Sequence, residues 1–419
     1  MTKQPRTRLG PILVLTFVAS LGTGVQWSGI SFIAKHEYGY GQELNFLLFI
    51  VAALAYIGAA FCAGPLTRAV SRRLSPRGLL AWTFILQSLV CILPLVFEGD
   101  WALWTVACGV SVLTATYWPI IESYLTAGRY GDEMRRAMGW WNISWTSAVG
   151  VALLLMAPLL DAERAVLAIV GLTPVFICCT LILPWFASAP GKHEEKQWKD
   201  SITTEYRYLL HSVRVILPIS YILIGTLSPL MPYRLEEVGA PTLAETPATA
   251  TWIFARVVAM AIMWRISFWR GRWGTLLSAG LFMTLGFALV VVAPTLPLLL
   301  VGLAAFGSAQ GMVYFAALYY AMSVGAGSVE SGGTHEALIG VGYAAGPIAA
   351  LAGMHGPALV GFGAVGGPGG IVAAVTGLTV IAALPALRPY VLVRRLRRAN
   401  QTCMDSRDPT PARLGEWKL

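Results

Sequence analysis

Long apolar runs separated by short polar turns alternate along the chain. Each run is about 20 residues or longer, which is the helix length that crosses a hydrocarbon core roughly 30 Å thick at about 1.5 Å per residue. The pattern therefore predicts transmembrane α-helices and not the strands of a membrane barrel. In the first half, the expected spans are 10–33, 44–66, 78–97, 101–125, 138–160 and 164–187. In the second half, they are 209–231, 246–267, 274–294, 296–324, 335–356 and 370–393.

The same arrangement of spans occurs twice. Gly78 and Gly274 are equivalent at an offset of 196 residues, and Tyr117 and Tyr314 are equivalent at an offset of 197. A nearly constant offset across several spans indicates a duplicated unit. The predicted fold class is therefore an all-α membrane protein with twelve transmembrane helices, arranged as two six-helix repeats.

One polar, charged stretch divides the two halves. We expect a first six-helix bundle at 1–187, a cytoplasmic linker at 188–208, a second bundle at 209–398 and a cytoplasmic tail at 399–419. The basic start followed by an apolar run is also a feature of cleavable signal peptides, but this run is too long and has no convincing cleavage site. It is therefore interpreted as the first span.

Lys and Arg residues are distributed unevenly between the two sides that the spans define. If the N-terminus is cytoplasmic, 26 of the 30 Lys and Arg residues fall in cytoplasmic segments. Lys35, Arg164 and Arg234 lie outside, and Arg256 lies within a span. The positive-inside rule then predicts that both termini are cytoplasmic. The net charge of +9 follows from this topology and from contact with anionic lipid, so it does not indicate nucleic-acid binding.

Composition agrees with this interpretation. The chain is 56% hydrophobic and 12% charged, about half the charge of a soluble globular domain. Five of its six cysteines fall within expected spans, so neither a disulfide framework nor the ligand spacing of a metal site is expected.

The two six-helix repeats, with arginine-rich turns after helices 2 and 8, resemble the major facilitator superfamily over almost the whole chain. The segment Gly64 to Arg73 is similar to the superfamily's signature between helices 2 and 3, which begins with Gly and ends in basic residues. The acidic residue of that signature is absent here, where Thr67 and Arg68 stand. Glu122 in helix 4 is a candidate to supply the carboxylate.

A second set of residues resembles a bacterial subgroup of this superfamily whose substrates are mostly unassigned. The set comprises Trp118-Pro119, Asn142, Trp145, His335-Glu336 and Gly346-Pro347. The Gly-Pro pair lies in helix 11 and not in helix 5, where the superfamily's antiporters carry it, so antiport is not inferred. Asn142 and Trp145 are expected to pack helix 5 and not to touch substrate.

The resemblance implies that helices 1, 4, 7 and 10 line a central cavity. Small and polar residues recur at helical spacing on these helices, as they also do where membrane helices simply pack closely. The larger polar residues favour a cavity, and we expect Gln26, Tyr221, Gln310 and Tyr314 to line it.

Arg256 stands in the middle of an expected span. Arginine at the bilayer centre costs about 2.5–3.5 kcal/mol on insertion scales, so its side chain should face protein or water and have a partner. Two interpretations remain open: a substrate anion in the cavity, or backbone carbonyls and a tyrosine at a contact between helices.

A cytoplasmic gate is expected where carboxylates meet arginines. Glu122, near the cytoplasmic end of helix 4, can pair with Arg135, Arg136 or an arginine of the turn between helices 2 and 3. Proton coupling and plain solvation are the alternatives for Glu122. Glu336 is expected on the same side, either in the gate or as a cap at the start of helix 11.

The predicted function is secondary-active or facilitative transport of a small organic solute, neutral or weakly anionic, by alternating access. The alternative is a transporter fold acting as a membrane sensor or assembly partner. An enzyme is not expected, because His335 and Glu336 point about 100° apart on a helix and no nucleophile accompanies them. No cofactor, no metal and no nucleic acid is expected. The partners are substrate and lipid, and the chain is expected to be a monomer in the inner membrane.

Overall fold

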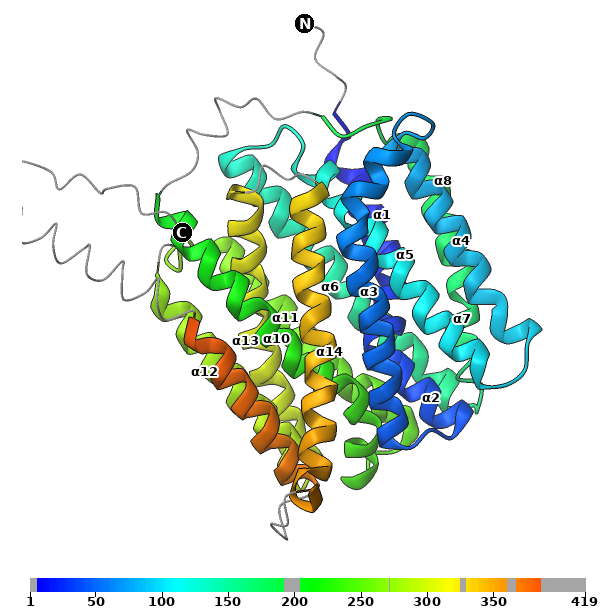
Figure 1. The fold of residues 1–419 in the computed structure, drawn as a ribbon, viewed down its shortest axis with the longest axis vertical. Coiled ribbons are helices and arrows are strands. Elements are labelled where there is room, and N and C mark those ends of the chain that lie inside the picture. The colour runs from blue at the N-terminus through cyan, green and yellow to red at the C-terminus, as the bar shows by residue number, and fades with distance from the viewer. Residues whose placement is uncertain (1–5, 192–203, 271, 325–328, 360–366, 386–419) are drawn as a thin grey trace, which may run out of the picture.

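A computed structural model describes residues 6–191, 204–270, 272–324, 329–359 and 367–385. Within these residues the regular structure is helical throughout, and twelve helices are long and apolar enough to cross a membrane. The predicted fold class is therefore confirmed. Figure 1 shows the helices running side by side in one bundle.

Six spans form the first half. The first is built from α1 (Leu9–Gly24), a short π-helix η1 (Val25–Gly29) and α2 (Ile30–Tyr38). The next four are α3 (Gln42–Val70), α4 (Pro76–Val96), α5 (Asp100–Thr126) and α6 (Gly131–Asp161). The sixth consists of α7 (Leu167–Val170), α8 (Leu172–Ile182) and the 3-10 turn η2 (Leu183–Trp185).

Six further spans form the second half. They are α10 (Thr204–Glu237), α11 (Thr242–Arg265), α12 (Trp273–Val292), α13 (Leu296–Val324), α14 (Val329–Leu359) and a last span at Pro368–Pro385. Part of the expected linker, residues 192–203, and the whole expected tail lie outside the described residues.

Local sequence signals account for several helix ends. Ser75 caps α4, where its hydroxyl accepts a hydrogen bond from the Gly78 backbone N–H at 3.1 Å and Pro76 occupies the first helical position. α2 stops at Gly39, whose φ of 66° is left-handed and suits glycine. The Tyr40 N–H then donates to the Ala34 carbonyl at 3.0 Å, which closes the end of the helix.

The start of α14 differs from the prediction. The span was expected from residue 335, whereas the helix begins at Val329. The Gly- and Ser-rich stretch looked like a turn, but in the helix its glycines permit close packing. A Cβ on Gly333 would lie 2.7 Å from the Ala60 carbonyl oxygen of α3. Glu336 is consequently two turns inside the helix, so the predicted role as an N-terminal cap is wrong.

Two pairs of helices form most of the contact between the halves. α14 packs along α3, and α11 packs along α6. Figure 1 shows α14 and α3 side by side along most of their length. Residues that face the space between these two pairs are therefore shared by both halves.

Candidate functional site

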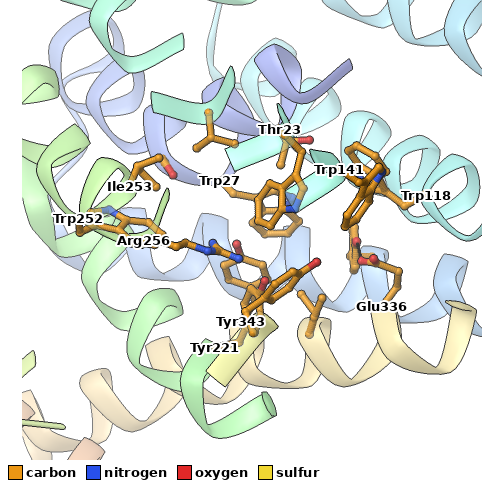
Figure 2. Close-up of a pocket in the computed structure, with 16 residues that line it drawn as sticks. Thr23, Trp27, Trp118, Trp141, Tyr221, Trp252, Ile253, Arg256, Glu336 and Tyr343 are labelled. Atoms are coloured by element: carbon orange, nitrogen blue, oxygen red, sulfur yellow. Dashed lines mark hydrogen bonds between the residues drawn. The ribbon is translucent and has the colours of Figure 1, made fainter. Parts of the chain in front are cut away.

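A cavity lies between the halves, with about 590 Å³ of space not filled by atoms when the open solvent at its mouth is included. Side chains from both halves line it, and most are aromatic (Figure 2). The aromatic residues are Trp27, Tyr56, Trp118, Trp141, Trp145, Tyr221, Trp252, Tyr314 and Tyr343. The others are Thr23, Ser28, Val149, Ile253, Arg256, Glu336 and Ile339. Figure 2 shows Arg256 and Glu336 at opposite ends of this group of side chains.

Arg256, from α11, is held between aromatic rings. Its guanidinium carbon lies 4.3 Å from the ring centroid of Trp145 and 4.5 Å from that of Tyr314, within the range of cation–π attraction. The residue is 3% exposed. Its Nε and Nη2 atoms are buried and have no hydrogen-bond partner among the described residues. The rings therefore stabilise the charge while two donors stay available.

Aromatic contacts also join the two halves across the cavity. Trp27 of the first half stacks on Tyr343 of the second half, with centroids 4.2 Å apart and planes at 11°. Tyr56 meets Trp27 edge-on at 5.4 Å, and Tyr221 meets Tyr343 edge-on at 5.0 Å. A planar solute in this space would find rings from both halves.

Two neighbouring residues of the π-helix in the first span face different ways. Trp27 lines the cavity, whereas Gln26 turns toward α5. The Gln26 amide nitrogen donates to the Ala107 carbonyl at 2.9 Å and to the Ser111 hydroxyl at 3.0 Å. Gln26 therefore ties two helices of the first half together.

The structure brings three of the five expected cavity residues together: Tyr221, Arg256 and Tyr314. Gln310 is fully buried with its amide atoms unpartnered among the described residues, and it does not line the cavity. Trp145, expected only to pack, lines the cavity instead. Asn142 does pack: its Oδ1 accepts from the Trp145 indole at 3.2 Å.

A cluster of Glu122, His335 and Glu336, here called the acidic–histidine cluster, lies beside the cavity. One ligand atom from each residue falls within 4.8 Å of the others, and all three side chains are buried. Both carboxylate oxygens of Glu122 and the His335 Nε2 have no hydrogen-bond partner among the described residues. Glu336 accepts a hydrogen bond from the Tyr56 hydroxyl.

Glu122 does not meet the arginines expected to pair with it. Arg135 forms an ion pair with Asp132 at 2.8 Å, and Arg136 is exposed. The reason is orientation: Glu122 faces the interior from α5, whereas both arginines lie near the surface start of α6. Within the described residues, Glu122 forms no ion pair.

Residues 12–350 match the sequence profile of the Major Facilitator Superfamily. The chain belongs to the major facilitator superfamily. No curated protein matches it in sequence. Membership makes the chain a transporter of the membrane, in agreement with its twelve spans.

Solved structures of superfamily transporters share the fold. A bacterial homologue of the human lysosomal transporter Spinster, inward-facing and occupied, is 16% identical with a TM-score of 0.59, over 91% of this chain and 96% of that one. The human organic anion transporter MFSD10 is 14% identical with a TM-score of 0.60, over 91% and 100%. The nucleoside transporter NupG is 11% identical with a TM-score of 0.63, over 91% and 98%.

This superfamily member has a polar network that sequence reasoning missed, at the end of the bundle where α2 finishes. We call Lys35, His36, Glu236 and Glu245 the outer-end network. Lys35 contacts Glu236 at 2.9 Å and donates to the Pro232 carbonyl at 2.9 Å. His36 Nε2 lies 2.7 Å from a carboxylate oxygen of the buried Glu245. These contacts join the first half to the second.

At the opposite end, an arginine braces the first half internally. Arg129, 2% exposed, donates to the carbonyls of Leu125 at 2.6 Å and Thr7 at 3.0 Å. Burial, together with the nearby charge of Arg6, lowers the pKa of Arg129 to about 10, against the opposing charge of Glu133. The guanidinium therefore fastens the turn after α5 to the chain before α1.

Proposed function

We propose that this protein transports a small organic anion with a planar or aromatic body by alternating access. The observation that carries the proposal is Arg256, which lines an aromatic cavity between the halves with two donors unpartnered among the described residues. Of the residues expected to meet substrate, we retain Tyr221, Arg256 and Tyr314 and add Trp27, Trp145 and Tyr343. We withdraw Gln26 and Gln310 from the set.

The charge of the substrate follows from the electrostatics of Arg256. A buried cation is costly unless it is paired, and the rings satisfy it only in part. A carboxylate accepts two parallel hydrogen bonds from one guanidinium, which is the strongest arrangement available to it. A neutral solute would leave the positive charge uncompensated. Within the predicted range of neutral or weakly anionic solutes, the site therefore favours an anion.

The planar shape of the substrate is inferred from the aromatic side chains that line the cavity. Nine aromatic side chains, contributed by both halves, line the cavity. Stacking against these rings stabilises a bound flat solute by about 0.5–1.5 kcal/mol for each well-placed pair of rings. An aromatic or conjugated carboxylate fits both the rings and Arg256.

Alternating access requires that the halves separate at one end at a time. In this structure they touch at both ends: the outer-end network closes one, and the contact of Gly333 with Ala60 closes the other. We propose that the end closed by the outer-end network opens toward the outside, and that the end closed by Gly333 and Ala60 opens toward the cytoplasm. This assignment puts the arginine-rich turns in the cytoplasm, and we also propose the inner membrane as the location, as the sequence predicts.

The cytoplasmic gate then differs from the one expected. Arg135 and Arg136 are placed at the rim, where they contact Asp132 and solvent. Glu122 and Glu336 lie deeper, between the helices that separate. We therefore assign the gate to the helix contact between α14 and α3, with Glu122 and Glu336 just inside it.

The test has a binding stage and a flux stage. Purified protein is screened by thermal shift against matched pairs of planar solutes, each acid beside its neutral amide. A specific ligand at a hundredfold excess over Kd stabilises the folded state by about 2.7 kcal/mol. We expect acids to bind and their amides not to bind, and the acids to enter proteoliposomes. Amides binding as well as acids would refute the anion assignment, and binding without flux would favour a membrane sensor.

A further inference from the structure

We propose that Glu122, His335 and Glu336 form a binding site for a divalent transition-metal ion, of the class of Zn²⁺ or Mn²⁺, between the two halves of the protein. The sequence predicted no metal site. The three residues come together only because α5 and α14 pack against each other.

The distances suit a metal ion. One donor atom from each residue lies within 4.8 Å of the other two. Around an ion with bonds of about 2.1 Å, the ligands of a tetrahedral shell lie about 3.4 Å apart. Small side-chain rotations therefore suffice to complete three ligands. Imidazole with two carboxylates favours Zn²⁺, Mn²⁺ or Fe²⁺, whereas Ca²⁺ and Mg²⁺ prefer oxygen ligands alone.

The unpartnered atoms point to a ligand that the protein itself does not supply. Glu122 is 2% exposed and His335 is 4% exposed, yet both Glu122 oxygens and the His335 Nε2 have no hydrogen-bond partner among the described residues. A buried polar atom without a partner costs about 1–3 kcal/mol, and a charged one costs more. A metal ion bonded to one oxygen of Glu122 and to the His335 nitrogen would remove most of this cost.

Charge distinguishes a metal ion from a proton. Two arginines lie in the same pockets as members of the cluster: Arg256 lines the cavity with Glu336, and Arg214 lines a smaller pocket with His335. Among the described residues, neither arginine forms an ion pair with Glu122 or Glu336. A proton on Glu122 neutralises only one of the two carboxylates. A divalent ion balances both carboxylates and also binds the nitrogen.

Neighbouring residues hold the proposed metal ligands in place. The Tyr56 hydroxyl donates to Glu336 and so orients its carboxylate. Hydrogen bonds of this kind to a metal ligand typically strengthen metal binding by 10–100-fold. Gly332 leaves the space that Glu122 occupies: a Cβ there would lie 2.8 Å from its Oε2.

The position of the site gives the ion a role in the transport cycle. Glu122 belongs to the first half, and His335 and Glu336 belong to the second. An ion bound to all three holds the halves together at this level and must lose ligands when they separate here. Because Glu336 also lines the cavity, the ion and the substrate meet at one side chain. This coupling rests on the proposed transport function, whereas metal binding does not.

The experiment measures metal binding to the purified full chain, without any transport assay. Metal-free protein is titrated with Zn²⁺ and with Mn²⁺ by calorimetry, and metal content is counted after dialysis. We expect one ion per chain in the wild type. Each of Glu122→Gln, His335→Gln and Glu336→Gln should weaken binding at least tenfold, and Tyr56→Phe about tenfold. His355→Gln, an exposed histidine near the other end of α14, is the matched control and should bind as the wild type does.

Two outcomes would overturn the proposal. One is a wild type that binds no stoichiometric metal. The other is binding that all three substitutions leave unchanged, which would place the ion elsewhere on the chain. Should a variant fail to fold, X-ray absorption of the zinc-loaded wild type decides. The proposal requires a coordination shell of one imidazole together with oxygen ligands, and any other shell contradicts the assignment. A failure of the transport proposal would leave these results intact.

Discussion

Replacing Arg256 by Met removes the charge and the two free donors but keeps much of the side-chain volume. If a carboxylate takes both donors, the loss is two charge-assisted hydrogen bonds of about 1.5–3 kcal/mol each. Affinity for the anion should then fall by at least about a hundredfold. Arg256→Lys keeps the charge but not the planar fork, so an intermediate loss of about tenfold is expected.

The same substitution should change the stability of the unliganded protein little. Removing Arg256 relieves two unpartnered donors, each costing about 1–3 kcal/mol. It also removes cation–π contacts with Trp145 and Tyr314, each worth about 0.5–2 kcal/mol. These contributions oppose each other, so the melting temperature should shift by no more than a few degrees.

The assay combines calorimetry with the acid found in the screen and thermal unfolding without it. Arg265→Met is the control, because Arg265 ends the same helix, is exposed and stacks on Trp264 at 5.3 Å. It should lose neither affinity nor stability. The reasoning is refuted if Arg256→Met binds the acid as the wild type does. A structural cation would instead show unchanged affinity and a clearly lower melting temperature.

Two further predictions concern the ends of the bundle. Glu245→Gln should weaken the outer-end network by about 1–2 kcal/mol. A reagent added from outside should then label Ser28→Cys in the cavity roughly tenfold faster. An unchanged labelling rate would show that this network does not hold that end closed. Gly333→Ala should destabilise the contact with α3 by about 1–3 kcal/mol and slow transport. Gly356→Ala is the control and should do neither, because there is open space around its Cβ position. Equal effects of the two substitutions on stability and transport would contradict a close-packed gate.

The number and the repetition of the spans could be predicted because hydrophobicity and length are properties of each segment alone. The superfamily could be recognised for a related reason, since its motifs lie in contiguous stretches such as Gly64 to Arg73. Both predictions are confirmed. The start of α14 could not be predicted, because glycine and serine mark a turn in water but close helix packing in a membrane.

The cavity was only partly accessible to sequence reasoning. Tyr221 and Tyr314 follow from regular helical spacing on helices whose inner faces can be inferred, and Arg256 follows from the cost of a charge in the middle of a span. Gln26 and Trp27 are adjacent in the first span, and helical spacing alone did not decide between them. In the structure Trp27 lines the cavity and the Gln26 amide donates to α5.

The sequence by itself determined which segments enter the membrane, how they repeat and which turns carry positive charge. Burial in lipid and attraction to anionic lipid act on each segment separately, so the order of residues along the chain is sufficient to predict them. Only the tertiary structure decided that Glu122 meets His335 and Glu336, that His36 meets Glu245, and that Arg135 does not reach Glu122. These contacts depend on how helices from different halves rotate and pack, and no local pattern encodes that.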